Sequence, residues 1–88
     1  MIVTFDKSFS KSLDKIGNAI ALKNTLKAIE KCEKANTLLE IPNLKKLKGY
    51  KNYYRIKIGD YRIGVEIEND VIDFILISHR KNIYNLFP

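Results

Sequence analysis

Residues 54–65 read Tyr-Arg-Ile-Lys-Ile-Gly-Asp-Tyr-Arg-Ile-Gly-Val, and this stretch decides the fold. Apolar and charged residues alternate on both sides of a central Gly59-Asp60 pair. Such alternation is typical of a strand with one buried face, and Gly-Asp is a good two-residue hairpin connection. The stretch therefore predicts two antiparallel strands in which Ile58 and Tyr61 are direct cross-strand partners.

Counting outward from this turn gives the hairpin two different faces. The apolar face, which we expect helices to cover, carries Tyr54, Ile56, Ile58, Tyr61, Ile63 and Val65. The opposite, charged face pairs Lys57 with Arg62, Arg55 with Gly64, and Tyr53 with Glu66. Like charges directly opposite each other destabilise a sheet, so the Lys57–Arg62 pair favours a bound anion or a functional need. Gly64 either leaves room for a ligand beside Arg55 or marks a bulge or bend.

The sequence around the hairpin predicts one α+β domain of residues 1–88, since a chain this short supports a single modest core. We expect a strand at Ile2–Phe5, helices at Lys7–Ile16 and Ala19–Ala35 packed as an antiparallel hairpin, and a loop at 36–49. Strands at about 52–58, 61–68 and 71–78 and a helical turn at 81–86 follow. The predicted architecture is a small antiparallel sheet of about four strands packed on a helical hairpin, in the order β-α-α-β-β-β-(short α).

The pattern also predicts which side chains meet. Helix residues expected to face the sheet are Leu13, Leu22, Leu26 and Ile29. After a turn at Asn69-Asp70, the last strand should place Ile72, Phe74 and Leu76 on the core face, and Asp73, Ile75, Ile77 and His79 on the charged face. Arg80 then has the wrong parity for the charged face, and reaches it only if the strand ends or bulges near Ser78.

The composition and the distribution of charge narrow the range of possible functions. The net charge is +6, and residues 43–57 hold six cations and no acid: Lys45, Lys46, Lys48, Lys51, Arg55 and Lys57. A basic segment with interleaved tyrosines is typical of a nucleic-acid surface, although Lys45 and Lys46 alone also fit a solvated loop.

The single cysteine, Cys32, is interpreted as a packing residue. No apolar run approaches the roughly 20 residues of a membrane span, and a reducing cytoplasm fits. We expect no metal site and no cofactor, because one His and one Cys far apart do not make a ligand set.

Two segments, Y-R-I-K-I-G-D-Y-R at 54–62 and H-R-K-N-I-Y at 79–84, resemble the RelE/ParE superfamily of toxin–antitoxin toxins. The chain is more narrowly similar to RelE-type ribosome-dependent mRNA interferases, and the similarity covers nearly its whole length. The resemblance implies a toxin that cleaves mRNA in the ribosomal A site without a metal ion, by attack of the 2′-hydroxyl on the adjacent phosphate. It also implies a cognate RelB-like antitoxin, mRNA, and a 70S-type ribosome with its rRNA as partners, and no membrane.

The resemblance assigns roles residue by residue. Arg55 stands where the family often has lysine, and Lys57 matches the second lysine of that strand. Arg62 follows the Gly-x-Tyr turn, Arg80 follows the last strand, and Tyr84 is the C-terminal tyrosine. The catalytic candidates are Arg62, Arg80, Lys57, Tyr84 and His79. The candidates for RNA or phosphate binding are Arg55, Lys51, Lys48, Lys45, Lys46, Lys81 and Tyr53.

Several roles stay open at this point. Arg62 and Arg80 suit the scissile phosphate because the planar guanidinium binds two oxygens at once. Lys57 is a base or a phosphate clamp, and Tyr84 transfers a proton, stacks on a base, or packs beside Phe87. His79 is an acid–base group or a cap of the strand end. Glu66 is catalytic or pairs with Arg55 or Arg62.

Two other function classes also stay open. One is a ParE-like inhibitor that binds DNA gyrase and does no chemistry. The other is a nucleic-acid-binding module whose basic face only neutralises phosphates. Three cations on one sheet face argue against the first class, and their pairing on a hairpin argues against the second.

Overall fold

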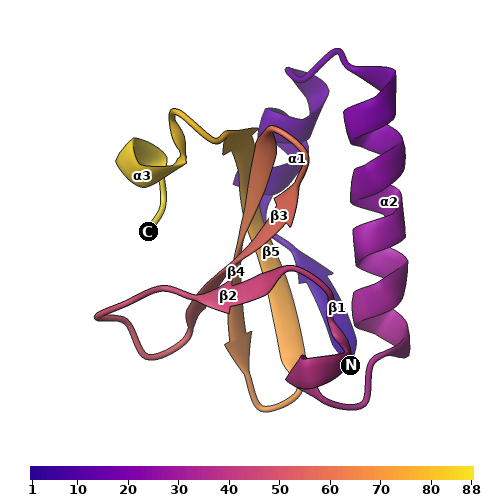
Figure 1. The fold of residues 1–88 in the computed structure, drawn as a ribbon, viewed down its shortest axis with the longest axis vertical. Coiled ribbons are helices and arrows are strands. Elements are labelled where there is room, and N and C mark those ends of the chain that lie inside the picture. Colours follow the sequence, from indigo (N-terminus) through magenta and orange to yellow (C-terminus); the bar gives the residue numbers. More distant parts are fainter.

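The computed structural model describes residues 1–88, and Figure 1 shows two helices on one side of a twisted sheet and a third on the other. The elements in chain order are β1 (Ile2–Phe5), α1 (Lys7–Asp14), α2 (Ala19–Lys34), the 3-10 turn η1 (Leu38–Glu40), β2 (Leu44–Lys46), β3 (Tyr53–Ile58), β4 (Tyr61–Glu68), β5 (Val71–His79) and α3 (Ile83–Leu86). The predicted α+β class and element order are confirmed. No helix is both long and apolar enough to span a bilayer.

The sheet differs from the expectation in two details. It has five strands in the order β1-β5-β4-β3-β2, because a short strand, β2, forms within the predicted loop and pairs with β3. The first strand, β1, pairs with β5 in parallel, so the sheet is mixed rather than purely antiparallel. A parallel pair needs a long connection, and here everything from α1 to β4 lies between the two strands.

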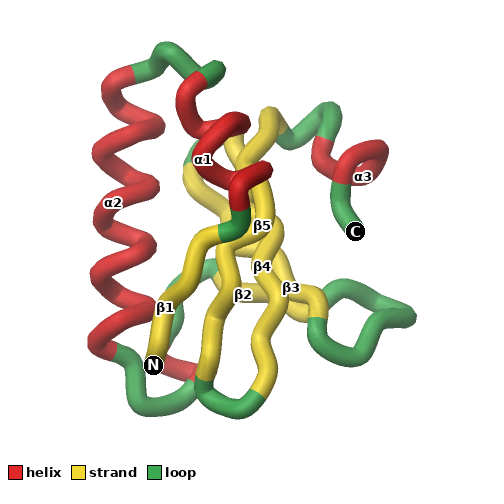
Figure 2. Tube along the Cα trace, turned by 180° about the vertical axis from the view of Figure 1, so that it is seen from behind, coloured by secondary structure: helices red, strands yellow, loops and turns green.

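The two long helices each pack on the sheet, as Figure 2 shows from behind. Helix α1 contacts β5, while α2 contacts β1 and β3. The two helices, which were expected to pack on each other as a hairpin, therefore each pack mainly on the sheet. Each helix begins at a polar cap: the Asp6 carboxylate accepts a hydrogen bond from the Ser8 N–H, and the Asn18 side chain accepts from Ile20 and Ala21. These caps satisfy amides that have no partner inside the helix.

Helix α2 turns a different face to the sheet than its largest apolar residues suggest. Leu22 and Leu26, predicted to be buried, are exposed. The buried face is instead made of small side chains, including Ala21, Thr25 and Cys32. The Thr25 hydroxyl donates to the Ala21 carbonyl at 2.7 Å, so its burial leaves no polar atom unpaired. The prediction followed an apolar stripe at helical spacing, and only Ile29 of the α2 residues that it placed against the sheet packs on the core.

The core lies between the sheet and these two helices. Its buried side chains are Phe9, Cys32, Ala35, Ile41, Ile56, Ile63, Val65, Ile67, Ile72, Phe74 and Ile77. Ile58 and the predicted helix residues Leu13 and Ile29 pack against this cluster as partly buried neighbours. The predicted core position of Leu76 is wrong, and Ile77 is buried in its place.

A bulge in β5 causes this exchange. Gly64 lies opposite Leu76 but the next residue, Val65, lies opposite Phe74, so Ile75 is an extra residue without a partner on β4. Helix α1 satisfies backbone groups of β5 beyond the point where β1 ends. The Ser8 hydroxyl donates to the Ile75 carbonyl, and the Ile77 N–H donates to the Ser12 hydroxyl. Every residue of β5 after Ile75 therefore points to the opposite face from the one that strict alternation predicts.

Candidate nucleic-acid interface

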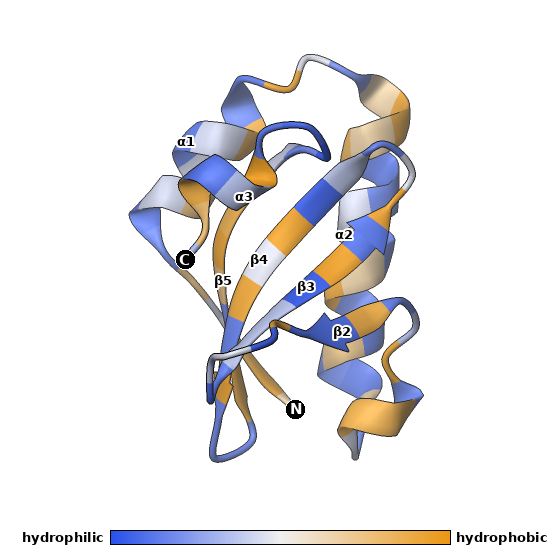
Figure 3. Ribbon diagram, turned by 60° about the vertical axis from the view of Figure 1, so that its left-hand side comes forward, coloured by the Kyte–Doolittle hydropathy of each residue, from blue (hydrophilic) through white to orange (hydrophobic).

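The charged face of the hairpin forms as predicted. Lys57 lies opposite Arg62, and Arg55 lies opposite Gly64. In Figure 3 the alternation appears as orange and blue bands along β3 and β4, with α2 behind them. Because the core cluster lies on the helix side, Arg55, Lys57 and Arg62 all occupy the side of the sheet away from α1 and α2. We call this side the cationic face.

Strand β2 brings a fourth cation to the cationic face. Lys45 lies opposite Arg55, and a shallow depression beside it is lined by Asn43, Leu44, Lys45, Arg55, Lys57 and Arg62. Asn43 adopts a φ of 63°, a left-handed conformation that asparagine tolerates, just before β2 begins. Four cations line this one depression and no carboxylate does, so the local positive potential favours an anion there.

The other predicted phosphate-binding lysines lie elsewhere. Lys46 is opposite Tyr54, a side chain that packs against the core, so Lys46 projects from the other face at the sheet edge. Lys48 is exposed in the loop between β2 and β3, and Lys51 lines a separate hollow next to Met1. Lys81 is exposed after β5. The structure therefore does not gather these four lysines into the depression.

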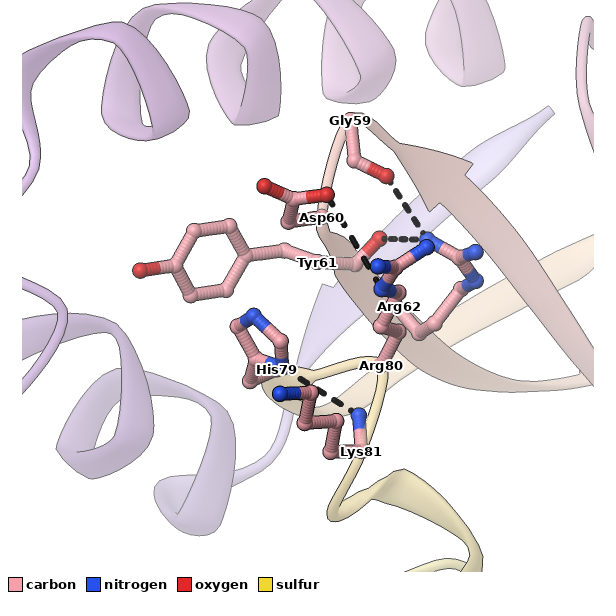
Figure 4. Close-up of polar contacts among 7 residues, drawn as sticks. All are labelled: Gly59, Asp60, Tyr61, Arg62, His79, Arg80 and Lys81. Atoms are coloured by element: carbon pink, nitrogen blue, oxygen red, sulfur yellow. Dashed lines mark hydrogen bonds and ion pairs between the residues drawn. The ribbon is translucent and has the colours of Figure 1, made fainter.

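Arg62 and Arg80 are both held at the β3–β4 turn, as Figure 4 shows. One terminal nitrogen of Arg62 donates to the carbonyls of Gly59 and Tyr61, at 2.8 and 2.9 Å. The Arg80 side chain lies 3.9 Å from the Asp60 carboxylate, and its backbone N–H donates to the Asp60 carbonyl at 2.8 Å. Both guanidinium groups keep further N–H donors for a ligand.

The bulge at Ile75 decides which side chains reach the cationic face. Ser78 lies opposite Arg62 and therefore shares its face, and Arg80 follows two residues later. From the sequence, Arg80 was expected to reach this face only if the strand ended or bulged near Ser78, and the structure has such a bulge three residues earlier, at Ile75. Arg80 lies in the turn directly after the strand, where its backbone N–H and its side chain both contact Asp60, two residues before Arg62.

His79 moves to the other side for the same reason, so its predicted place on the charged face is wrong. It lies opposite Tyr61, and the two rings meet edge to face with centroids 5.8 Å apart. With Lys11 of α1 and Lys15, which directly follows that helix, it lines a separate hollow. Its Nδ1 accepts the Lys81 N–H at 3.2 Å, so the imidazole caps the turn that carries Arg80.

Tyr84 does lie over the cationic face. Its hydroxyl accepts a hydrogen bond of 2.7 Å from Arg55, whose guanidinium carbon is 5.8 Å from the tyrosine ring centroid. Tyr84 remains 69% exposed, which leaves its ring open to a ligand. Tyr53 is half-buried on the same face and contacts the Tyr50 and Phe87 rings edge to face.

Two sequence hypotheses about this face are corrected. Glu66 forms no ion pair with Arg55 or Arg62, and it lines a different hollow together with Asp73. The space beside Gly64 is not open to a ligand, because the Phe87 ring occupies it. The alternative interpretation of Gly64, that it marks a bulge, is confirmed by the register shift between Gly64 and Val65.

The sequence profile described as "ParE toxin of type II toxin–antitoxin system, parDE" matches residues 3–84. Toxin RelE3 of Methanocaldococcus jannaschii is 45% identical over 89 residues and the full length of both chains. The chain belongs to the RelE/ParE family of type II toxin–antitoxin toxins. The predicted membership of this family, and the closer similarity to RelE-type toxins, are confirmed.

Solved structures of RelE/ParE-family toxins share the fold. The match to the RelB–RelE antitoxin–toxin complex from Methanococcus jannaschii has a TM-score of 0.80 and 44% identity, covering 97% of this chain and 99% of that one. The RelE–RelB complex from Pyrococcus horikoshii OT3 gives 0.70 and 24%, covering 90% and 93%. The isolated RelE toxin of E. coli gives 0.65 and 22%, covering 96% and 90%. At these two lower identities the likeness concerns the fold alone.

Sequence reasoning missed three parts of this RelE/ParE-family site. It did not find the Asp60 contact to Arg80, the seat of Phe87 on Gly64, or the strand that carries Lys45. Of these, only Gly64 gave a signal, as a glycine inside an otherwise regular strand.

Cys32 is fully buried, and burial raises the pKa of its thiol to about 11, so the thiol stays protonated at neutral pH. No group of three His, Cys, Asp or Glu side chains lies together as a metal site.

Proposed function

We propose that this toxin is an endoribonuclease that cleaves mRNA in the A site of the ribosome. The observation that carries the proposal is the depression lined by Lys45, Arg55, Lys57 and Arg62. Arg80 contacts Asp60 in the β3–β4 turn, next to Arg62. Cations concentrated at one point fit a phosphodiester, which carries negative charge in the ground state and gains more in the transition state. Its target would put the toxin in the cytoplasm.

The proposed reaction is an internal transfer. The 2′-hydroxyl oxygen attacks the adjacent phosphorus and loses its proton to a base. The bond from phosphorus to the 5′ oxygen breaks, that oxygen takes up a proton, and a 2′,3′-cyclic phosphate remains, with no water consumed. Arg62 and Arg80 hold the phosphate oxygens and stabilise their developing charge, since preorganised donors are usually the largest catalytic term.

Lys57 and Tyr84 complete the proposed catalytic set. Lys57 lies opposite Arg62 and acts as a second phosphate clamp or as the base. The exposed Tyr84 ring, held above Arg55, transfers a proton or stacks on a base of the message. We assign His79 a supporting role, because it caps the turn before Lys81 from the other face.

The remaining cations serve binding in this proposal. Arg55, Lys45 and Tyr53 lie on the cationic face and contact the message. The lysines outside the depression, which are Lys46, Lys48, Lys51 and Lys81, contact ribosomal RNA. Dispersed cations raise affinity and association rate for a polyanion without taking part in chemistry.

Induction of the toxin in growing cells, followed by mapping of RNA 5′ ends, tests the proposal. We expect new ends inside translated reading frames and none in a matched message whose start codon is removed, because the ribosome must present the substrate. Equal cleavage of both messages would reject ribosome dependence. No cleavage of either would reject the endoribonuclease.

The matching profile carries the description of a ParE toxin, which favours one alternative. Here the toxin would inhibit DNA gyrase without chemistry. Growth arrest with gyrase-dependent DNA breaks and intact messages in the same induced cells would select this alternative.

We also propose a cognate RelB-like antitoxin, since two of the similar structures are described as RelB–RelE complexes. The net charge of +6 favours an acidic partner, which covers the cationic face or displaces residues 82–87. Co-expression with the neighbouring reading frame should restore growth, and the two chains should co-purify. Recovery of the toxin without an acidic partner would contradict this expectation.

A further inference from the structure

Helix α3 is too short to be stable by itself. It has four residues, Ile83–Leu86, and forming a single turn fixes more backbone than its hydrogen bonds repay. Two buried side chains hold it: Ile83 is 3% exposed and Phe87, directly after the helix, is 5% exposed. Tyr84 lies between these anchors and is 69% exposed. The position of Tyr84 therefore depends on packing made by its neighbours.

The Phe87 anchor has a matched seat in the centre of the sheet. A Cβ atom built on Gly64 would lie 2.6 to 2.7 Å from three carbons of the Phe87 ring, closer than real contacts allow. The ring also meets Tyr53 edge to face, with centroids 5.3 Å apart. The φ of Gly64 is not positive, so its backbone conformation does not require glycine. Glycine is required here because any side chain would collide with the Phe87 ring.

The seat and the Tyr84 hydrogen bond are adjacent. Gly64 lies directly opposite Arg55, and Arg55 donates to the Tyr84 hydroxyl at 2.7 Å. A ring placed on Gly64 thus brings the one-turn helix over Arg55, within reach of the cationic depression. If the ring leaves its seat, one of the two anchors of α3 is lost, and the tyrosine is free to swing away.

We propose that Phe87, docked on Gly64, is a positioning residue that holds Tyr84 at the cationic face. The inference rests on the proposed endoribonuclease function for its consequence in catalysis. Phe87 does not touch the substrate, and it acts through the place it gives to Tyr84. Misplacement of a reacting group by about 1 Å can cost on the order of 100-fold in rate, so the dock matters for turnover more than for ribosome affinity.

The test measures cleavage of ribosome-bound message for a set of variants over a series of ribosome concentrations that reaches saturation. We expect Phe87→Ala to lower the turnover rate by at least about 10-fold with little change in the half-saturating concentration, and Phe87→Leu to restore most of the rate. Leu86→Ala is the matched control, because Leu86 belongs to the same helix but is 56% exposed. Equal rates for Phe87→Ala and Leu86→Ala, with the parent active, would overturn the proposal.

Double variants separate positioning from a general loss of stability. Gly64→Ala should be as slow as Phe87→Ala, because its methyl group expels the ring. Combining the two should cost nothing further, since the methyl then enters empty space. Phe87→Ala should likewise add less than about 2-fold to Tyr84→Ala, because the dock acts only through that tyrosine. Additive losses in both pairs would overturn the proposal.

A measurement without ribosomes distinguishes the dock from the reaction. NMR of the free toxin should show contacts between the Gly64 α-protons and the Phe87 ring, and Phe87→Ala should move the Tyr84 ring signals toward those of a tyrosine in an unfolded peptide, because the ring then loses its fixed place over Arg55. This result together with an inactive parent would reject the endoribonuclease and support the dock. Unchanged Tyr84 signals in Phe87→Ala would reject the dock itself.

Discussion

Replacing Arg80 by alanine is expected to slow single-turnover cleavage of ribosome-bound message by at least about 100-fold, the scale of losing one preorganised oxyanion donor. Because such a contact strengthens as charge develops, binding to the ribosome should weaken far less. The variant should fold normally. The Arg80–Asp60 pair spans 3.9 Å between side chains that are 57% and 70% exposed, and an open pair of this kind adds little stability.

Lys45→Ala is the contrasting variant for this experiment. Lys45 also lines the cationic depression, but it lies on an edge strand opposite Arg55 rather than at the turn. Its loss should reduce affinity and flatten the salt dependence of binding while leaving the chemical step nearly intact. Parental cleavage by a folded Arg80→Ala would reject the catalytic role of Arg80, and the absence of cleavage by the parent toxin would favour a module that only binds.

Replacing Ile63 by alanine should destabilise the fold by roughly 2–5 kcal/mol, the range for truncating a buried aliphatic side chain and leaving a cavity. Ile63 is fully buried in the central strand, with Ile56 opposite it on β3 and Ile77 opposite it on β5. Three strands and the helix layer surround the site, so little can collapse into the gap. A loss of this size is a large part of the stability of about 5–15 kcal/mol that is usual for a domain.

Urea unfolding followed by circular dichroism measures this effect. Leu39→Ala is the matched control, because Leu39 is 98% exposed and its truncation should change the free energy of unfolding by less than about 0.5 kcal/mol. A midpoint for Ile63→Ala equal to that of the control would mean that the core is packed differently. An altered slope with the same midpoint would point to a change in the unfolded state instead.

The sequence predicts the central hairpin to the residue because everything that determines its register is local. The Gly59-Asp60 turn sets the pairing, and the alternation on either side agrees with it. From that register follow the buried Ile56 and Ile63 and the shared face of the cations. Strand β2 escapes prediction because three residues are too few to show a period.

The remaining errors arise where a distant segment decides the outcome. The α2 face depends on how close the helix comes to the sheet, which favours small residues such as Thr25 over Leu26. The role of Gly64 cannot be predicted from its own strand, because the side chain that packs on it, Phe87, lies 23 positions away in the sequence. Two serines of α1 bond the β5 backbone at the Ile75 carbonyl and the Ile77 N–H. No pattern within a single strand carries such information.

The extra residue at Ile75 has a consequence for how relatives of this toxin are compared. A chain that lacked this one position would keep the same His-Arg pair, yet strand alternation would turn the imidazole toward the cationic face and the guanidinium toward α1. Columns of an alignment after this point therefore describe the same side of the sheet only if insertions here are tracked. A single-residue gap in this strand, which is easily dismissed as noise, would separate toxins that present opposite members of the same His-Arg pair on the cationic face.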